Sequence, residues 1–130
     1  MQLRKINPWS YPEGMDQGVE ISNFSRLIFV SGQCAVGPDG SSLHPGDMSA
    51  QCQAALDNVE TVLANAGLSL ANIVRMNTYV TDMAAYLDAA AEPMSVRLAR
   101  HSVSPPGVLA GVVELGRKDL LIEIEAFAAA

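Results

Sequence analysis

Two glutamates near the carboxyl end are the first candidates for a functional site. Glu123 and Glu125 stand two residues apart in a run of aliphatic and β-branched residues, Leu120–Phe127, which predicts a strand. Because side chains alternate along a strand, both carboxylates point to one face of the sheet. The opposite face receives Ile122, Ile124 and Ala126. A carboxylate on a half-buried strand needs water, a hydrogen-bond donor or another subunit as its partner.

A second predicted strand, Ile73–Thr81, places a basic residue, Arg75, near the two glutamates. Its alternation separates a mostly apolar face from a polar one. The apolar face holds Val74, Met76, Thr78 and Val80, and the polar face holds Arg75, Asn77, Tyr79 and Thr81. Arg75 is the only basic residue that the alternation places beside the glutamates. It either pairs with one of them across the strands or serves as the cation for a ligand.

The cysteines and histidines form no pattern that indicates a catalytic or metal site. Cys34 follows a predicted strand and Cys52 lies on the buried stripe of a predicted helix, so we interpret both as small core residues with free thiols. They form no metal-binding spacing. His44 and His101 stand far from any acid or cysteine pattern that would make a triad or a metal site. The sequence therefore predicts no metal and no cofactor.

Length and charge exclude several classes of protein. A chain of 130 residues is expected to form one domain, residues 1–130, with a core large enough to be stable without a disulfide. Eight basic and fourteen acidic residues give a net charge of −6, with the basic residues scattered, which argues against nucleic-acid binding. No run approaches the roughly 20 apolar residues of a membrane span, and the amino end lacks the apolar core of a signal peptide. We expect a cytoplasmic protein with no membrane partner.

The elements that must position these residues follow an order β-β-β-α-β-α-β-β. The predicted strands are Leu3–Asn7, Gln17–Ile21, Arg26–Gln33, Ile73–Thr81, Gly107–Val113 and Leu120–Phe127, with helices at Met48–Ala66 and Met83–His101. Asp47 and Asp82 are the expected N-caps, Gly67 ends the first helix, and Pro93 should kink or restart the second. The buried stripe of the first helix is predicted as Cys52, Ala55, Leu56, Val59, Val62, Leu63 and Ala66. This order predicts an α+β fold: one mixed sheet of about five to six strands, with two helices on one face.

The face of the sheet opposite the helices mixes charged, polar and apolar side chains. Covering it with the same face of another copy buries the apolar residues and leaves polar clefts at the seams. We therefore expect a homo-oligomer with sites between subunits.

Four segments also match a known pattern in the right order: Phe29–Gln33, the helix after Asp47 with Gln51, Ala55, Leu56, Asn58 and Val59, the strand Val74–Asp82, and Ile122–Ala126. With them the chain, from about Gln17 to Phe127, resembles the Rid family (RidA, YjgF, also called the L-PSP endoribonuclease family). The resemblance implies a chorismate-mutase-like (YjgF-like) protomer and a homotrimer with ligand clefts at its three interfaces. Active members hydrolyse small enamines and imines, such as 2-aminoacrylate, to 2-oxo acids and ammonia.

The resemblance also assigns site residues. Ser31 and Gly32 would offer a backbone donor to the substrate, and Glu123 would position a water. The alternative for Gly32 is a purely structural role, as a bulge residue or a glycine that allows close packing. The family holds the substrate carboxylate with an arginine in a Pro-x-Arg-Ser/Thr-x motif, and here Gly107 occupies the arginine position. Leu109 stands where a cysteine is frequent, and Met15 aligns with a tyrosine of the cleft.

Glycine supplies neither the charge nor the orientation of a bidentate arginine. Either another cation takes the role, with Arg75 as the hypothetical substitute, or the ligand lacks a carboxylate, or the chemistry is lost. Two functions stay open: a small-molecule hydrolase of the enamine/imine deaminase type that uses Glu123, and a non-catalytic homotrimeric metabolite-binding or regulatory protein, in which Glu123 is only a hydrogen-bonded interface residue. Endoribonuclease activity is a weaker third alternative, which the acidic charge disfavours.

Overall fold

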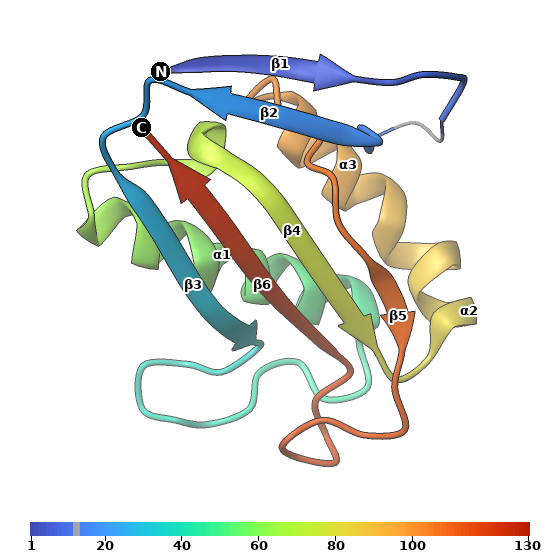
Figure 1. The fold of residues 1–130 in the computed structure, drawn as a ribbon. Coiled ribbons are helices and arrows are strands. Elements are labelled where there is room, and N and C mark those ends of the chain that lie inside the picture. The colour runs from blue at the N-terminus through green and yellow to red at the C-terminus, as the bar shows by residue number, and fades with distance from the viewer. Residues whose placement is uncertain (12–13) are drawn as a thin grey trace.

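The main sheet has four strands. The computed structural model describes residues 1–11 and 14–130. It orders the sheet β3-β6-β4-β5, with β3 at Leu27–Cys34, β6 at Ile122–Ala129, β4 at Ile73–Val80 and β5 at Leu109–Gly111. β5 is parallel to β4, and the other neighbours are antiparallel. The last two predicted strands are therefore not neighbours, because β4 lies between them (Figure 1).

The first two strands form a sheet of their own. β1 (Gln2–Ile6) and β2 (Gly18–Ser22) pair only with each other, as an antiparallel ribbon that lies across one end of the main sheet (Figure 1). The sequence predicted one sheet of five to six strands, and the six strands instead divide into four and two. Alternation identifies strands but carries no information about which strands pair. The α+β class and the two helices on one face are confirmed.

Helix α1 (Met48–Asn65) begins and ends as its caps predict. Asp47 accepts a hydrogen bond from the Ala50 N–H at 3.0 Å. Gly67 follows the helix with a φ of 74°, a conformation that glycine adopts without strain. The predicted stripe is buried from Cys52 to Val59 and at Leu63, but Val62 is 38% exposed, so its assignment to the core is wrong, and Ala66 is only partly buried. Val62 instead lines an open cavity between α1 and β3.

The second helix is continuous but irregular. It consists of α2 (Met83–Ala85), a π-helical turn η2 (Tyr86–Ala90) and α3 (Ala91–Ala99). The irregularity was predicted at Pro93, and it lies one turn earlier, in η2. A proline ring clashes with the carbonyl four residues before it in a regular α-helix, and for Pro93 that residue is Ala89 of this turn. A short 3₁₀ turn, η1 (Leu70–Asn72), leads into β4.

Both helices cover the same face of the sheet (Figure 1), and the core lies between these layers. The alternation of β6 is as predicted: Ile122, Ile124 and Ala126 are fully buried beneath the helices. The other face is open within the chain, and there Phe29 is 68% exposed and packs edge-on against Phe127, with ring centres 5.4 Å apart. None of the helices in the described residues has the length and apolar character needed to cross a membrane.

Candidate functional site

A bulge in β3 brings a glycine against Glu123. The pairing of β3 with β6 shifts register between Val30 and Gln33, so Ser31 and Gly32 form the bulge. A Cβ atom on Gly32 would lie 2.7 Å from Cδ of Glu123 and 2.8 Å from its Oε1. The Glu123 carboxyl group therefore rests directly on the backbone of Gly32. Gly32 is the bulge residue that the sequence offered as one interpretation, and it also lines a cavity; a backbone donor to a substrate stays a prediction.

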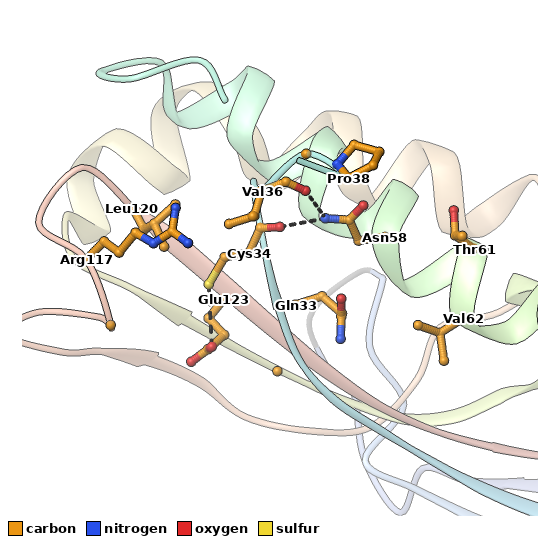
Figure 2. A pocket seen from close by; sticks show the side chains of 13 residues that line it. Gln33, Cys34, Val36, Pro38, Asn58, Thr61, Val62, Arg117, Leu120 and Glu123 are labelled. Atoms are coloured by element: carbon orange, nitrogen blue, oxygen red, sulfur yellow. Dashed lines mark hydrogen bonds between the residues drawn. The ribbon is translucent and has the colours of Figure 1, made fainter. Parts of the chain in front are cut away.

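Cys34 completes this contact. Its thiol donates a hydrogen bond to Oε1 of Glu123 at 3.4 Å (Figure 2). Burial, together with the charge and hydrogen bond of Glu123, raises the pKa of the Cys34 thiol to about 12, although Arg117 opposes the rise. The thiol is therefore a protonated donor rather than a nucleophile. Cys34 is half-buried at the cavity wall, whereas Cys52 is fully buried in the core as predicted.

The cavity beside Glu123 has a volume of about 610 Å³ and is open to solvent. β3 and the loop after it, α1, and the turn before β6 form its walls (Figure 2). Asn58 of α1 donates from its side-chain amide to the carbonyls of Cys34 (2.8 Å) and Val36 (2.9 Å). These bonds hold the loop after β3 at the rim of the cavity, so the wall next to Glu123 is fixed by the helix.

Arg117 is the residue of this cavity that sequence reasoning missed. It lies in the polar segment Gly116–Asp119 between two predicted strands, to which the sequence assigned no role, and the structure brings that segment to the cavity. Its Nη1 donates to the Gly40 carbonyl at 2.6 Å and contacts the Ser42 hydroxyl at 3.3 Å. The same hydroxyl donates to Asp119 Oδ1 at 3.0 Å. Arg117 and Gly40 lie 77 residues apart in the chain. No local sequence pattern could have predicted that their two loops meet.

Arg75 and Glu125 lie elsewhere on the open face. Glu125 accepts hydrogen bonds from the Asn77 amide at 2.8 Å and the Tyr79 hydroxyl at 2.7 Å. These bonds, with the charge of Arg75, hold the pKa of Glu125 below its ordinary value. Arg75 is exposed, stands opposite Phe127 and is outside the cavity wall. Across residues 1–11 and 14–130 it forms no ion pair with either glutamate.

Gly107 lies where no side chain fits. A Cβ atom there would stand 1.6 Å from the Met76 carbonyl oxygen, well inside atomic contact. The next residue, Val108, donates its N–H to Asn77 Oδ1 at 2.9 Å, which holds the segment against β4. An arginine at position 107 is therefore incompatible with this backbone.

The remaining positions assigned by the resemblance, Ser31, Met15 and Leu109, lie outside the cavity beside Glu123. Ser31 is exposed in the bulge and is not part of the cavity wall. Met15 and Leu109 line a second, mostly apolar cavity of about 250 Å³ beside the π-helical turn. In the part of the chain that the structure describes, no group of three or more His, Cys, Asp or Glu residues is arranged to hold a metal.

Comparison with known proteins identifies the family and similar folds. The family model described as Endoribonuclease L-PSP matches residues 13–130. A 2-iminobutanoate/2-iminopropanoate deaminase of Escherichia coli is 34% identical over 114 residues, covering 86% of this chain and 84% of that protein. A Rid-family protein of unknown function from Yersinia pestis has a TM-score of 0.78 at 31% identity, with both chains fully covered. E. coli TdcF, solved with bound serine, has a TM-score of 0.72 at 29% identity, covering 95% of this chain and 93% of that one.

Proposed function

This chain belongs to the endoribonuclease L-PSP family, the Rid/YjgF family, and we propose that it is a homotrimeric hydrolase of small imines or enamines. One observation supports this most: the Glu123 carboxyl group lies on the Gly32 backbone, at the wall of an open cavity and with one oxygen held by Cys34. The similarity to an E. coli imine deaminase supports the same reaction class. The structure of TdcF with bound serine supports a small amino-acid-like ligand.

The reaction needs only water and a carboxylate. With a protonated 2-imino acid, water adds to the imine carbon, a C–O bond forms, and the π electrons of the C=N bond move to nitrogen. Glu123 accepts the proton that the water releases and returns it to the nitrogen. The C–N bond then breaks with its electron pair on the departing ammonia, and the hydroxyl loses its proton as the carbonyl forms. One water is consumed, and a 2-oxo acid and ammonium are produced.

The open sheet face supports the assembly. Leu27, Phe29 and Phe127 lie together on it, with no helix of the same chain covering them. Large exposed apolar side chains grouped on one face are typical of an interface. We propose that three 13.8-kDa chains cover these faces mutually, which would bring further residues to each cavity.

The test is ammonia release from freshly generated 2-iminopropanoate and 2-iminobutanoate, with spontaneous decay as background. We expect acceleration by the purified protein, and a fall of about 10²- to 10⁴-fold in Glu123→Gln, which keeps the shape of the side chain and removes the base. Circular dichroism checks that the variant is folded. If the protein does not accelerate any small imine, or if Glu123→Gln is fully active, the hydrolase proposal fails.

A binding protein without activity is the second candidate, and the closed contact at Gly107 is the observation that favours it. Titration with 2-oxo acids separates the two: binding without any ammonia release supports the binding protein. Arg75 remains the cation that the sequence alone proposed, and unchanged affinity in Arg75→Ala would remove it. Ribonuclease activity is tested by incubating the protein with single-stranded RNA, and the acidic charge leads us to expect no cleavage.

A further inference from the structure

We propose that Arg117 binds the carboxylate of a small 2-imino or 2-oxo acid in the cavity beside Glu123. This inference rests on the proposed function, because it names the cation of the same site. In this proposal the positive charge that position 107 lacks is supplied by Arg117, in the turn before β6. The argument has three parts: where Arg117 is held, which of its donors are free, and what stands opposite.

Arg117 is held in place before any ligand arrives. Its Nη1 is fixed by the Gly40 carbonyl at 2.6 Å and the Ser42 hydroxyl at 3.3 Å. The turn is anchored further by Gln51, fully buried in α1, which donates to the Asp119 carbonyl at 2.8 Å and accepts from the Leu121 N–H at 2.8 Å. A cation on an anchored turn loses little side-chain freedom when it binds a ligand.

The tether leaves one edge of the guanidinium free. Arginine has five N–H donors in a planar fork, and here only Nη1 is engaged. Nε and Nη2 have no hydrogen-bond partner among residues 1–11 and 14–130. Those two nitrogens present parallel donors, which is the arrangement that a carboxylate accepts in a bidentate contact.

The cavity also keeps the cation and Glu123 apart. Arg117 and Glu123 line the same cavity and both act on the charge state of the Cys34 thiol, yet they form no ion pair in the described part of the chain (Figure 2). The Cys34 thiol occupies one oxygen of Glu123. A small substrate therefore has a cation for its carboxylate and, separately, a carboxylate for the water that attacks its imine carbon.

The experiment measures binding, independently of turnover. Pyruvate and its neutral analogue pyruvamide are titrated into the full-length protein and followed by calorimetry or NMR. Wild type should bind pyruvate at least about tenfold more tightly than pyruvamide, the scale of a charge-assisted hydrogen bond. Arg117→Gln should lose that preference by weakening pyruvate alone, and Arg117→Lys should recover part of it.

Two matched variants exclude other causes. Lys118→Gln removes one positive charge from the neighbouring residue of the same exposed turn, so it tests long-range charge. Ser42→Ala removes one of the two contacts that fix Nη1 of Arg117, so it should weaken pyruvate binding less than Arg117→Gln does. Lys118→Gln should keep the preference for pyruvate.

The outcomes separate this inference from the hydrolase proposal. If pyruvate binding depends on Arg117 while no imine is hydrolysed, the inference stands and the hydrolase fails. If imines are hydrolysed through Glu123 while Arg117→Gln binds pyruvate as wild type does, the inference is overturned and the hydrolase stands. Failure of the wild type to bind pyruvate, or a loss equally large in Lys118→Gln or Ser42→Ala, also overturns the inference.

Discussion

The thiol of Cys34 lies 3.4 Å from Oε1 of Glu123 and donates a hydrogen bond to it. The two residues are opposite one another in the pairing of β3 with β6, so the sheet itself brings them together. A thiol in this position directs one carboxylate oxygen and leaves the other for a ligand or water. Cys34 is thus a positioning residue for Glu123.

The Cys34 thiol should resist alkylation in the folded protein. With a pKa of about 12, only about one thiol in ten thousand is ionised at pH 8, and the thiolate is the reactive form. Iodoacetamide followed by mass spectrometry should therefore label neither cysteine of the native protein at pH 8 within the time that labels both in urea. Rapid labelling of native Cys34 would mean that the thiol does not stay protonated beside Glu123.

Gly32→Ala should reduce activity while the fold survives. The new Cβ meets the end of the Glu123 side chain at 2.7–2.9 Å, and that flexible side chain can swing away at little cost to stability. Because Glu123 then leaves its position over the bulge, we expect the rate of imine hydrolysis to fall at least about tenfold, as small misplacements of catalytic groups do. Thermal unfolding provides the control. An unchanged rate in a variant whose structure shows Glu123 displaced would contradict the assigned role of this carboxylate.

Gly107→Ala should destabilise the protein severely. Its Cβ collides with the Met76 carbonyl oxygen at 1.6 Å, and both groups belong to backbone that is tied into the sheet. We expect a loss of at least about 3 kcal/mol in the free energy of unfolding, measured in urea. Gly116→Ala is the matched control, because nothing lies within 4 Å of its Cβ, and it should stay within about 0.5 kcal/mol of wild type. A stable Gly107→Ala would show that the segment can move away from β4.

Asp16→Asn should weaken the fold in a pH-dependent way. Burial alone would raise the pKa of Asp16, but hydrogen bonds from Asn7, Ser104 and Lys5 outweigh it, and the folded pKa is lowered. The stabilisation is therefore present above the ordinary pKa of aspartate and is lost as the pH falls through the folded value. Urea unfolding should show the variant about 1–3 kcal/mol less stable at pH 7, with the difference shrinking as the pH falls below the ordinary pKa of aspartate. A difference independent of pH would contradict this, and Glu20→Gln in an exposed ion pair should change much less.

Phe29→Glu should dissociate the proposed trimer without unfolding the chain. The ring is 68% exposed on the open sheet face, so its replacement leaves the core intact but places a charge in the interface. Light scattering after size exclusion should give three 13.8-kDa chains for wild type and a single chain for the variant. Val113→Glu, at a residue 99% exposed in the loop before β6, should remain trimeric. A wild-type monomer would refute the assembly.

Short-range patterns in the sequence were sufficient for the elements and their faces. The alternation around Glu123, and from Arg75 onward in β4, assigned the side chains to the correct side of the strand, since a period of two follows from strand geometry alone. It is wrong at Val74, because an irregularity between Ile73 and Arg75 puts Ile73 in the core instead. The cap at Asp47 and the glycine at position 67 likewise act within a few residues. Membership in the family also follows from the sequence, because its motifs are local and occur in the family's order.

The tertiary structure alone decided what surrounds Glu123. The bulge at Gly32 and the thiol of Cys34 lie on β3, far from Glu123 in the chain, and Arg117 is fixed by the equally distant Gly40. Their meeting depends on register and on loop packing. The same holds for the contact that excludes a side chain at Gly107. Local periodicity carries no information about such pairings, because they are set by which strands and loops become neighbours when the whole core is buried.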